Sequence, residues 1–346
     1  MFRFECDYNN GCVPEILKRL QETNDEQTCG YGEDAYCESA RKKIRAAVGA
    51  IDADVHFLVG GTQTNLIVIA AALRPHQGAL AATTGHINVH ETGAVEATGH
   101  KVLALMSEDG KLHADAVEAY CRAHYADASF EHAVQPGLCY ISQPTEHGLL
   151  YTKAELTELR EVCDRYGMYL FADGARLGYG LATKENDVSL HDLYALTDVF
   201  YIGGTKVGAL FGEAVVIRSP ALRKDFRYLI KQRGAMFAKG RLLGLQFDTL
   251  FTDDLYLRIA RHAVGEAMRL KETLRACGIP LFIDSPTNQQ FPILADEALP
   301  LLRKEFAFSY WERVDETHSA VRLCTSWATK AEEVDALSDM LRRLPH

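Results

Sequence analysis

"DVFYIGGTKVGALFGEAVVI" (198–217) contains two continuous apolar runs, separated by a glycine-rich turn with a lysine at position 206. A strand of four to six apolar residues without polar alternation is typical of a sheet that is covered on both faces. Further runs of this kind are DVHFLVGG (54–61), HKVLALM (100–106), GLCYISQ (137–143) and MYLFADGAR (168–176).

Segments with helical periodicity lie between these strands. We expect helices over 63–73, 114–124 and 152–167. In the first, the buried stripe is predicted to be Leu66, Ile69, Ala70 and Leu73. In the last, Thr152 and Glu155 form a capping box and Gly167 suits the stop. This alternation predicts a doubly wound α/β domain with a mostly parallel sheet.

The last hundred residues change character. A long helix is expected over 254–278, followed by strand-like and helical segments of a small α+β unit. We therefore predict a large α/β domain over 1–250, with a short N-terminal arm, and a small domain over 251–346.

Composition restricts the class of protein. The 346 residues are 47% hydrophobic and carry a formal net charge of −10, and no dense basic run is present, so nucleic-acid binding is not expected. No apolar window approaches the ~18 residues of a membrane span, and the N-terminus lacks the apolar core of a secretory signal. The nine cysteines include no C-x-x-C pair. This favours reduced thiols in a cytoplasmic protein and disfavours sulfur-bound zinc.

Three polar groups follow strands, where ligands collect in open α/β sheets. A helix is expected to begin after Gly60, Gly61 and Thr62. The backbone amides at such a helix start can bind an anion, but the same residues are also typical of a tight turn with no ligand. Asp173 ends another strand. An acid at this position either caps the following helix or has a functional role. Lys206 is a surface lysine, a phosphate-binding lysine or a nucleophile, and the small residues around it would leave room for something flat.

Together the three groups fit pyridoxal 5'-phosphate. That cofactor needs a phosphate clamp, an acid for its ring nitrogen and an amine for its aldehyde. The pattern G-x-x-x-x-G-K-[ST] is absent, which removes the nucleotide-phosphate alternative for Lys206.

The chain resembles the threonine aldolase branch of the β-eliminating lyases, which are fold-type-I pyridoxal phosphate enzymes. The matching segments run in order along the chain: GYGED (30–34), VGGTQTN (59–65), GHINVHETGAVE (85–96), FADGARLG (171–178), GGTKVGALFG (203–212), QRGAMFAKGRLLG (232–244) and VRLCTSW (321–327).

This resemblance implies the roles of nine residues. Lys206 would form the Schiff base, Asp173 would pair with the ring nitrogen, and His86 would stack on the ring. Gly61 and Thr62 would hold the phosphate, helped by Lys239. Arg176 and Arg322 would grip the substrate carboxylate. Lys239 and Tyr31 would come from a neighbouring subunit, which implies a homodimer or homotetramer with sites at the dimer interface.

The chain departs from the family pattern at three places. The usual Ser-Asp-Thr near the N-terminus is Cys6-Asp7-Tyr8, and Thr205 replaces the serine before the lysine. The segment SQPTEHG (142–148) has no clean counterpart of a family histidine, and His147 is not given its role. His86 and His90 have metal-pair spacing but no third ligand at a telling distance, so no metal is expected.

The resemblance implies retro-aldol cleavage of β-hydroxy-α-amino acids, threonine and allo-threonine, to glycine and acetaldehyde. His86 or a bound water is the candidate base for the hydroxyl proton. Two alternatives remain open: β-elimination or transamination with the same cofactor, and a noncatalytic pyridoxal-phosphate-binding protein.

Overall fold

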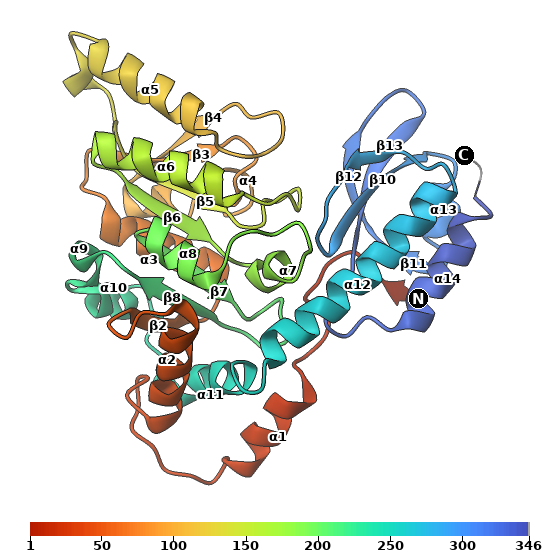
Figure 1. The fold of residues 1–346 in the computed structure, drawn as a ribbon, viewed down its shortest axis with the longest axis horizontal. Coiled ribbons are helices and arrows are strands. Elements are labelled where there is room, and N and C mark those ends of the chain that lie inside the picture. The colour runs from red at the N-terminus through yellow and green to blue at the C-terminus, as the bar shows by residue number, and fades with distance from the viewer. Residues whose placement is uncertain (345–346) are drawn as a thin grey trace.

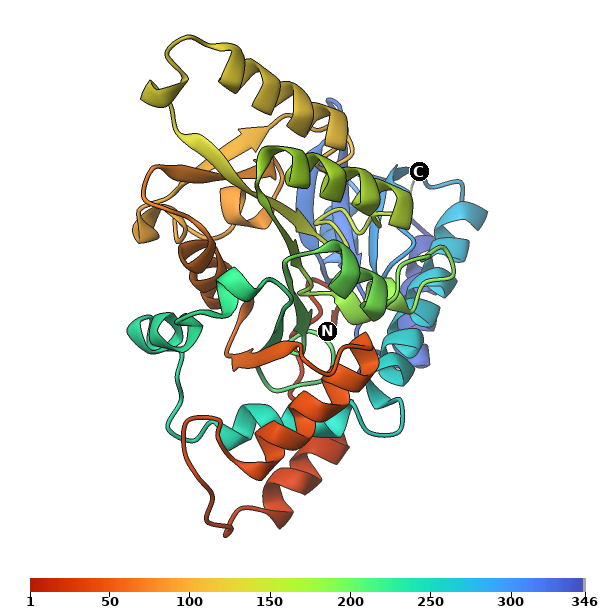
Figure 2. The ribbon, with the colours of Figure 1, turned by 60° about the vertical axis from the view of Figure 1, so that its left-hand side comes forward.

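The computed structural model describes residues 1–344, and its centre is a seven-stranded sheet (Figures 1 and 2). The strand order is β2-β8-β7-β6-β5-β3-β4. The strands are β2 (Asp54–Leu58), β3 (Gln77–Ala82), β4 (Lys101–Leu105), β5 (Gln135–Ser142), β6 (Tyr169–Asp173), β7 (Val199–Gly203) and β8 (Glu213–Ile217). β8 runs antiparallel to both neighbours and the remaining pairs are parallel, which confirms the predicted mostly parallel sheet.

Helices cover both faces of this sheet (Figure 2). The helices of this part of the chain are α1 (Pro14–Glu22), α2 (Ala35–Val48), α3 (Gly61–Ala72), α4 (His86–Val89), α5 (Ala114–Ala126), α6 (Lys153–Tyr166), α7 (Leu177–Leu181), α8 (Leu190–Leu196), α9 (Pro220–Arg223), α10 (Phe226–Gln232) and α11 (Arg241–Leu250), with single 3₁₀ turns at Glu96–Thr98 and Phe130–His132. Along β6, Leu170 and Ala172 join the core shared with α2, α6 and α11, whereas Phe171 joins the core shared with α3 and α10. Strands buried on both sides explain the continuous apolar runs.

The start and stop signals of α6 are confirmed. The Thr152 side chain accepts from the Glu155 amide, the Glu155 carboxylate accepts from the Thr152 amide, and Gly167 ends the helix at φ 66°. A left-handed residue at this position suits glycine because no Cβ is present to clash.

The predicted apolar stripe of α3 is wrong in part. Ile69 and Leu73 are buried, but Leu66 and Ala70 are only partly buried. Buried positions include the polar Thr64 and Asn65. The helix packs against both the sheet and α10, so it is covered on more than one side and no single stripe defines it.

The C-terminal part begins with α12 (Leu255–Ala276), which leads from the large sheet to the small sheets (Figure 1). The remaining elements are β9 (Leu281–Ile283), β10 (Gln289–Ala295), α13 (Leu299–Leu302), β11 (Phe306–Ala307), β12 (Ser309–Arg313), β13 (His318–Cys324) and α14 (Ala331–Leu341). β12, β13, β10 and β9 form an antiparallel sheet in that order.

The N-terminal arm crosses to this second part. β1 (Phe2–Arg3) pairs in parallel with β11, and the Cys324 amide donates to the Phe4 carbonyl. The division into 1–250 and 251–346 stays a prediction about folding units.

Two further features concern the whole described chain. All nine cysteines are free, and six of them are buried. Across residues 1–344, no helix combines the length and the apolar character that a membrane crossing needs.

Candidate active site

A cavity of about 560 Å³ lies at the carboxyl ends of the central strands. Ser142 and Asp173 are the last residues of β5 and β6, and Lys206 follows β7. Trp311 of β12 and Arg322 of β13 line the same space, so both sheets contribute to the wall. This is the edge of a parallel sheet where ligands bind.

Seven of the nine predicted site residues line this cavity. They are Gly61, Thr62, His86, Asp173, Arg176, Lys206 and Arg322. The other two, Tyr31 and Lys239, do not line it.

The Asp173 carboxylate receives four hydrogen bonds. Oδ1 accepts from the Tyr201 hydroxyl at 2.5 Å and from the Ala175 amide at 2.9 Å. Oδ2 accepts from the Tyr140 hydroxyl at 2.6 Å and from Asn65 Nδ2 at 3.0 Å. A buried carboxylate with this many donors is fixed in position and held in its charged form.

The charge of Asp173 is maintained against its surroundings. Burial alone would raise its pKa, but the nearby His86 and the hydroxyl donors outweigh burial and hold the pKa below the usual value. Glu91 extends the network, because its Oε1 accepts from Asn65 Nδ2 at 2.7 Å and lies 2.8 Å from His86 Nδ1. The acid and the imidazole are thereby parts of one fixed arrangement.

Lys206 is partly buried in the turn between β7 and β8, at the cavity wall. Burial lowers the pKa of its amine, and the charge of Arg176 lowers it further. A lowered pKa leaves more of the amine unprotonated near neutral pH, and this form is the nucleophile.

The glycines before Lys206 have a structural reason other than the predicted one. A Cβ at Gly203 would collide with the backbone of Gly174 and Ala175, and one at Gly204 would lie 2.8 Å from the Gly212 carbonyl oxygen. These glycines therefore allow close packing of the turn, and room for a flat ligand comes from the cavity beside it.

Glu213 lies across the turn from the lysine. Its Oε1 accepts from Thr205 Oγ1 at 2.8 Å, and its Oε2 accepts from the Gly204 amide at 3.2 Å. Burial raises its pKa to about 8. Thr205, which replaces the usual serine, thus supports the turn through this carboxyl group.

The start of α3 fits a phosphate. Its N-cap is Gly60, which offers no side-chain acceptor, and its first turn contains no acidic residue. Gly61 and Thr62 line the cavity, so first-turn amides and the positive end of the helix dipole face it. Together with Asp173 and Lys206, this donor set matches the groups of pyridoxal phosphate.

Arg176 has a partner that we did not predict. Its Nε and Nη2 donate to the Asp7 carboxylate at 2.7 and 3.0 Å, and Asp7 also accepts from Asn288 Nδ2 at 2.9 Å. Burial opposes ionisation of Asp7, but Arg176 and Lys206 hold its pKa below the usual value. Asp7 therefore occupies one edge of the guanidinium group, formed by Nε and Nη2, and the predicted contact of Arg176 with a substrate carboxylate stays a prediction.

Replacing Asp7 by asparagine should lower the free energy of unfolding by about 3–5 kcal/mol, because Arg176 would stay charged in the interior without its partner. Since the folded pKa of Asp7 is lowered, its stabilising effect is present above the ordinary carboxyl range and is lost as the pH falls. Urea unfolding at neutral and acidic pH measures both effects. The exposed Asp52→Asn is the matched control, expected within about 0.5 kcal/mol of wild type; an equal result for both variants would contradict the importance of this pair.

Arg322 is the more available arginine. Its Nη2 donates to the Glu5 carbonyl at 3.1 Å, its Nη1 contacts Gln289 Oε1 at 3.4 Å, and its guanidinium carbon lies 5.5 Å from the Trp311 ring centroid. These partners are all neutral, so none of them compensates the charge of Arg322. Arg322 therefore suits a carboxylate ligand better than Arg176 does.

Tyr31 and Lys239 do not line the cavity. Both are exposed, and the Tyr31 amide donates to the Ala238 carbonyl at 3.1 Å. Their contribution to a site in a neighbouring subunit stays a prediction.

His147 also lies away from the cavity. Its Nδ1 is 3.3 Å from the Asp109 carbonyl oxygen, and its ring packs edge-on against Trp311 and Phe291.

Several site residues escaped the sequence analysis. They are Asp7, Asn65, Tyr140, Glu146, Tyr201 and Glu213. Some of them lie within segments that were quoted in the sequence analysis. A polar residue inside an otherwise apolar strand or helix was the signal that could have identified them. Asn65 and Tyr140 both match that signal, since each is a buried polar group aimed at Asp173.

The fold and the cavity together define a class: fold-type-I enzymes that depend on pyridoxal phosphate. Aspartate aminotransferase from Thermus thermophilus shares the fold, with a TM-score of 0.72 at 15% identity over 99% of this chain and 91% of that one. A model of the beta-eliminating lyase family matches residues 9–339, and the chain belongs to that family.

Its similarity to particular relatives extends over nearly the full length. The structure of a threonine aldolase from Leishmania major superposes with a TM-score of 0.96 at 45% identity and covers 99% of both chains. The low-specificity L-threonine aldolase of Pseudomonas aeruginosa is 29% identical over 343 residues, which are 98% of this chain and 97% of the relative.

Proposed function

We propose that this protein cleaves β-hydroxy-α-amino acids, with L-threonine and L-allo-threonine as substrates, to glycine and acetaldehyde. The observation that carries the proposal is the pairing of a charged, fixed Asp173 with a partly buried Lys206 of lowered pKa in one cavity. Threonine aldolase relatives that match along the whole chain support the choice of reaction.

The position of each cavity residue determines which part of the cofactor or the substrate it would bind. The amides of Gly61 and Thr62 would hold the phosphate of pyridoxal phosphate, Asp173 its ring nitrogen and Lys206 its aldehyde carbon. When bound, the cofactor supplies an electron sink for the bond that breaks. Arg322 binds and orients the substrate carboxylate, and this alignment can contribute several kcal/mol. His86 lies at the wall where it can cover the ring.

Assembly and location follow as parts of the same proposal. Tyr31 and Lys239 are exposed together outside their own cavity, which supports a homodimer or homotetramer in which they complete the neighbour's site. The nine free thiols support a cytoplasmic location.

The test measures products from three substrates. Purified protein loaded with pyridoxal phosphate should release acetaldehyde and glycine in equal amounts from threonine, with aldehyde formation followed by a coupled alcohol dehydrogenase. Serine and cysteine should give far less pyruvate. Pyruvate as the main product would assign β-elimination instead, and a coloured protein that converts none of the three would show a binding protein.

A further inference from the structure

The proposed cleavage needs a group that accepts the proton of the β-hydroxyl, and this inference rests on that proposed function. The sequence offered only His86 or a water molecule for the task. The structure adds carboxyl groups as candidates, because Glu146, Asp173 and Glu213 all line the cavity.

Two of the three carboxyl groups are occupied. Each oxygen of Asp173 accepts two hydrogen bonds. Each oxygen of Glu213 accepts one, from Thr205 or from Gly204. Every carboxyl oxygen of Asp173 and Glu213 therefore already accepts a hydrogen bond from the protein. Neither group has an oxygen left to accept a proton from a substrate.

Glu146 differs in how its two oxygens are used. Oε1 accepts from Ser142 Oγ at 2.7 Å and from the His86 amide at 2.8 Å. Oε2 accepts from no donor within residues 1–344, although the side chain lines the cavity. One oxygen therefore fixes the carboxyl group and the other is left for a ligand.

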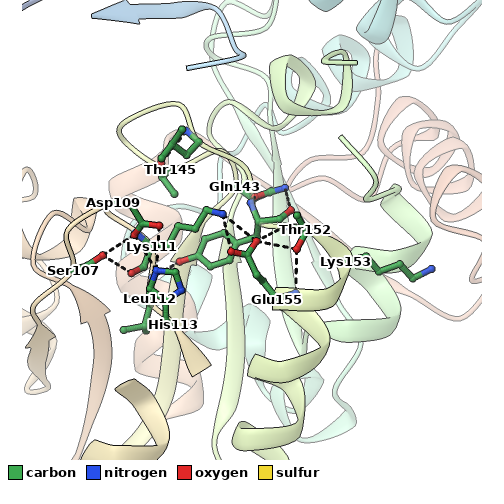
Figure 3. A network of polar contacts seen from close by, with 12 residues as sticks. Ser107, Asp109, Lys111, Leu112, His113, Gln143, Thr145, Thr152, Lys153 and Glu155 are labelled. Carbon is green, nitrogen blue, oxygen red and sulfur yellow. Dashed lines mark hydrogen bonds and ion pairs between the residues drawn. The ribbon is translucent and has the colours of Figure 1, made fainter. Parts of the chain in front are cut away.

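The loop that carries Glu146 is rigid on both sides. The Gln143 side chain donates to the Tyr151 carbonyl at 3.1 Å and accepts from the Tyr151 amide at 2.8 Å. The Leu149 carbonyl accepts from the Thr145 amide at 2.8 Å. Figure 3 shows Gln143 near the Lys111–Glu155 ion pair, which joins the segment before α5 to the start of α6. Such support is what a catalytic side chain needs to keep its position.

The histidines of the cavity are less suited to the task. Nδ1 of His86 is held by Glu91 at 2.8 Å, and the ring is placed where it can stack on the cofactor. His90 is exposed at the rim, and its pKa is lowered by burial of part of the ring and by the charge of His86.

We propose that the Glu146 carboxylate, through Oε2, accepts the β-hydroxyl proton as the Cα–Cβ bond breaks. The O–H electron pair becomes the second bond of the aldehyde carbonyl, and the Cα–Cβ pair remains with the glycine fragment. A proton from water then bonds to Cα, and Glu146 releases the hydroxyl proton to water, so the protons balance and no oxidant or reductant is needed.

The electrostatic setting agrees with this role. Burial raises the pKa of Glu146, and the nearby Asp173 adds to the rise, whereas the Ser142 hydroxyl and His86 oppose it. Burial raises the pKa of Tyr140 and of Tyr151, so both of these neighbouring phenols stay neutral. A carboxylate whose pKa is raised is a stronger base, which favours proton transfer.

The test uses Glu146→Gln, whose amide oxygen can still accept from Ser142 and His86. Threonine cleavage should fall by about 10²–10⁴-fold in kcat. Exchange of the glycine α-proton with deuterated water, followed by NMR, should continue at the wild-type rate because it involves no hydroxyl. The dissociation constants of glycine and pyridoxal phosphate, from absorbance titration, should not change. NMR titration of carboxyl-labelled glutamate in the cofactor-free protein should show one group of raised pKa that the variant lacks.

Two further variants sharpen the result. Glu158→Gln, on the exposed side of α6, should cleave threonine like wild type. His86→Phe keeps an aromatic ring at the wall and should lose less activity than Glu146→Gln.

The outcomes separate the two proposals. Wild-type cleavage by Glu146→Gln, loss of both cleavage and exchange in that variant, or a larger loss in His86→Phe would each overturn the role of Glu146. A wild-type protein that neither cleaves threonine nor exchanges the glycine proton would overturn the proposed function itself.

Discussion

Replacing Lys206 by alanine is expected to abolish threonine cleavage. The amine is partly buried at the wall of the cavity, and burial lowers its pKa, so it is available as a nucleophile near neutral pH. An amine in this position can also move protons, and the loss of a positioned acid–base group alone costs about 10²–10⁴-fold. Loss of covalent attachment adds to this, so turnover should fall below detection in the aldehyde assay.

The control for this variant is Lys224→Ala, because Lys224 is exposed and does not line the cavity. It should retain full activity. Circular dichroism and thermal unfolding should show that Lys206→Ala is folded, since the side chain makes no hydrogen bond to another described residue. Residual activity of more than a few per cent in a folded Lys206→Ala protein would contradict its assigned role.

Replacing Asp173 by asparagine should reduce kcat by about 10²–10³-fold or more, the scale observed when one preorganised electrostatic group is removed. The substitution keeps the size of the side chain but removes the negative charge that His86 and two tyrosine hydroxyls maintain. Affinity for pyridoxal phosphate should fall as well, because the ring nitrogen loses its charged partner. Steady-state kinetics and absorbance titration measure the two effects separately.

A graded variant tests whether the charge or the geometry of Asp173 matters. Tyr140→Phe removes one of the four hydrogen bonds but leaves the carboxylate in place. It should lose far less activity than Asp173→Asn. Similar losses in both variants would mean that the tyrosine, and not the carboxylate charge, is the important group.

Much of the fold was predictable because local signals agree with the tertiary structure. Uninterrupted apolar runs located six of the seven strands of the large sheet, and the capping box at Thr152 located the start of α6. β3 (Gln77–Ala82) was missed, because its alanine-rich sequence carries no run of large apolar residues. The residues at strand ends, Asp173 and Lys206, were predictable for the same reason, since strand ends of a parallel sheet meet at one edge. The buried face of α3 was not, because a helix packed on several sides has no single apolar stripe.

The hydrogen-bond partners of the site residues could not be predicted from the sequence, because they lie far from those residues along the chain. Asp7 and Arg176 are 169 residues apart, and Asp7 and Asn288 are 281 apart. Nothing in the sequence around Arg176 indicates that Asp7 occupies one edge of its guanidinium group. Glu146 was hidden for another reason: one more glutamate in a polar loop carries no signal until the structure shows how its two oxygens differ.

The crossing of the N-terminal arm has a consequence for biosynthesis. Asp7 precedes the large sheet in the chain, whereas its partner Asn288 and β11, the strand that pairs with β1, follow that sheet and are synthesised later. The large sheet can form beforehand, since domains fold as units during synthesis. Until the later segments are synthesised, the Asp7–Arg176 ion pair lacks the Asn288 donor, and the cavity lacks the part of its wall that Trp311 and Arg322 form.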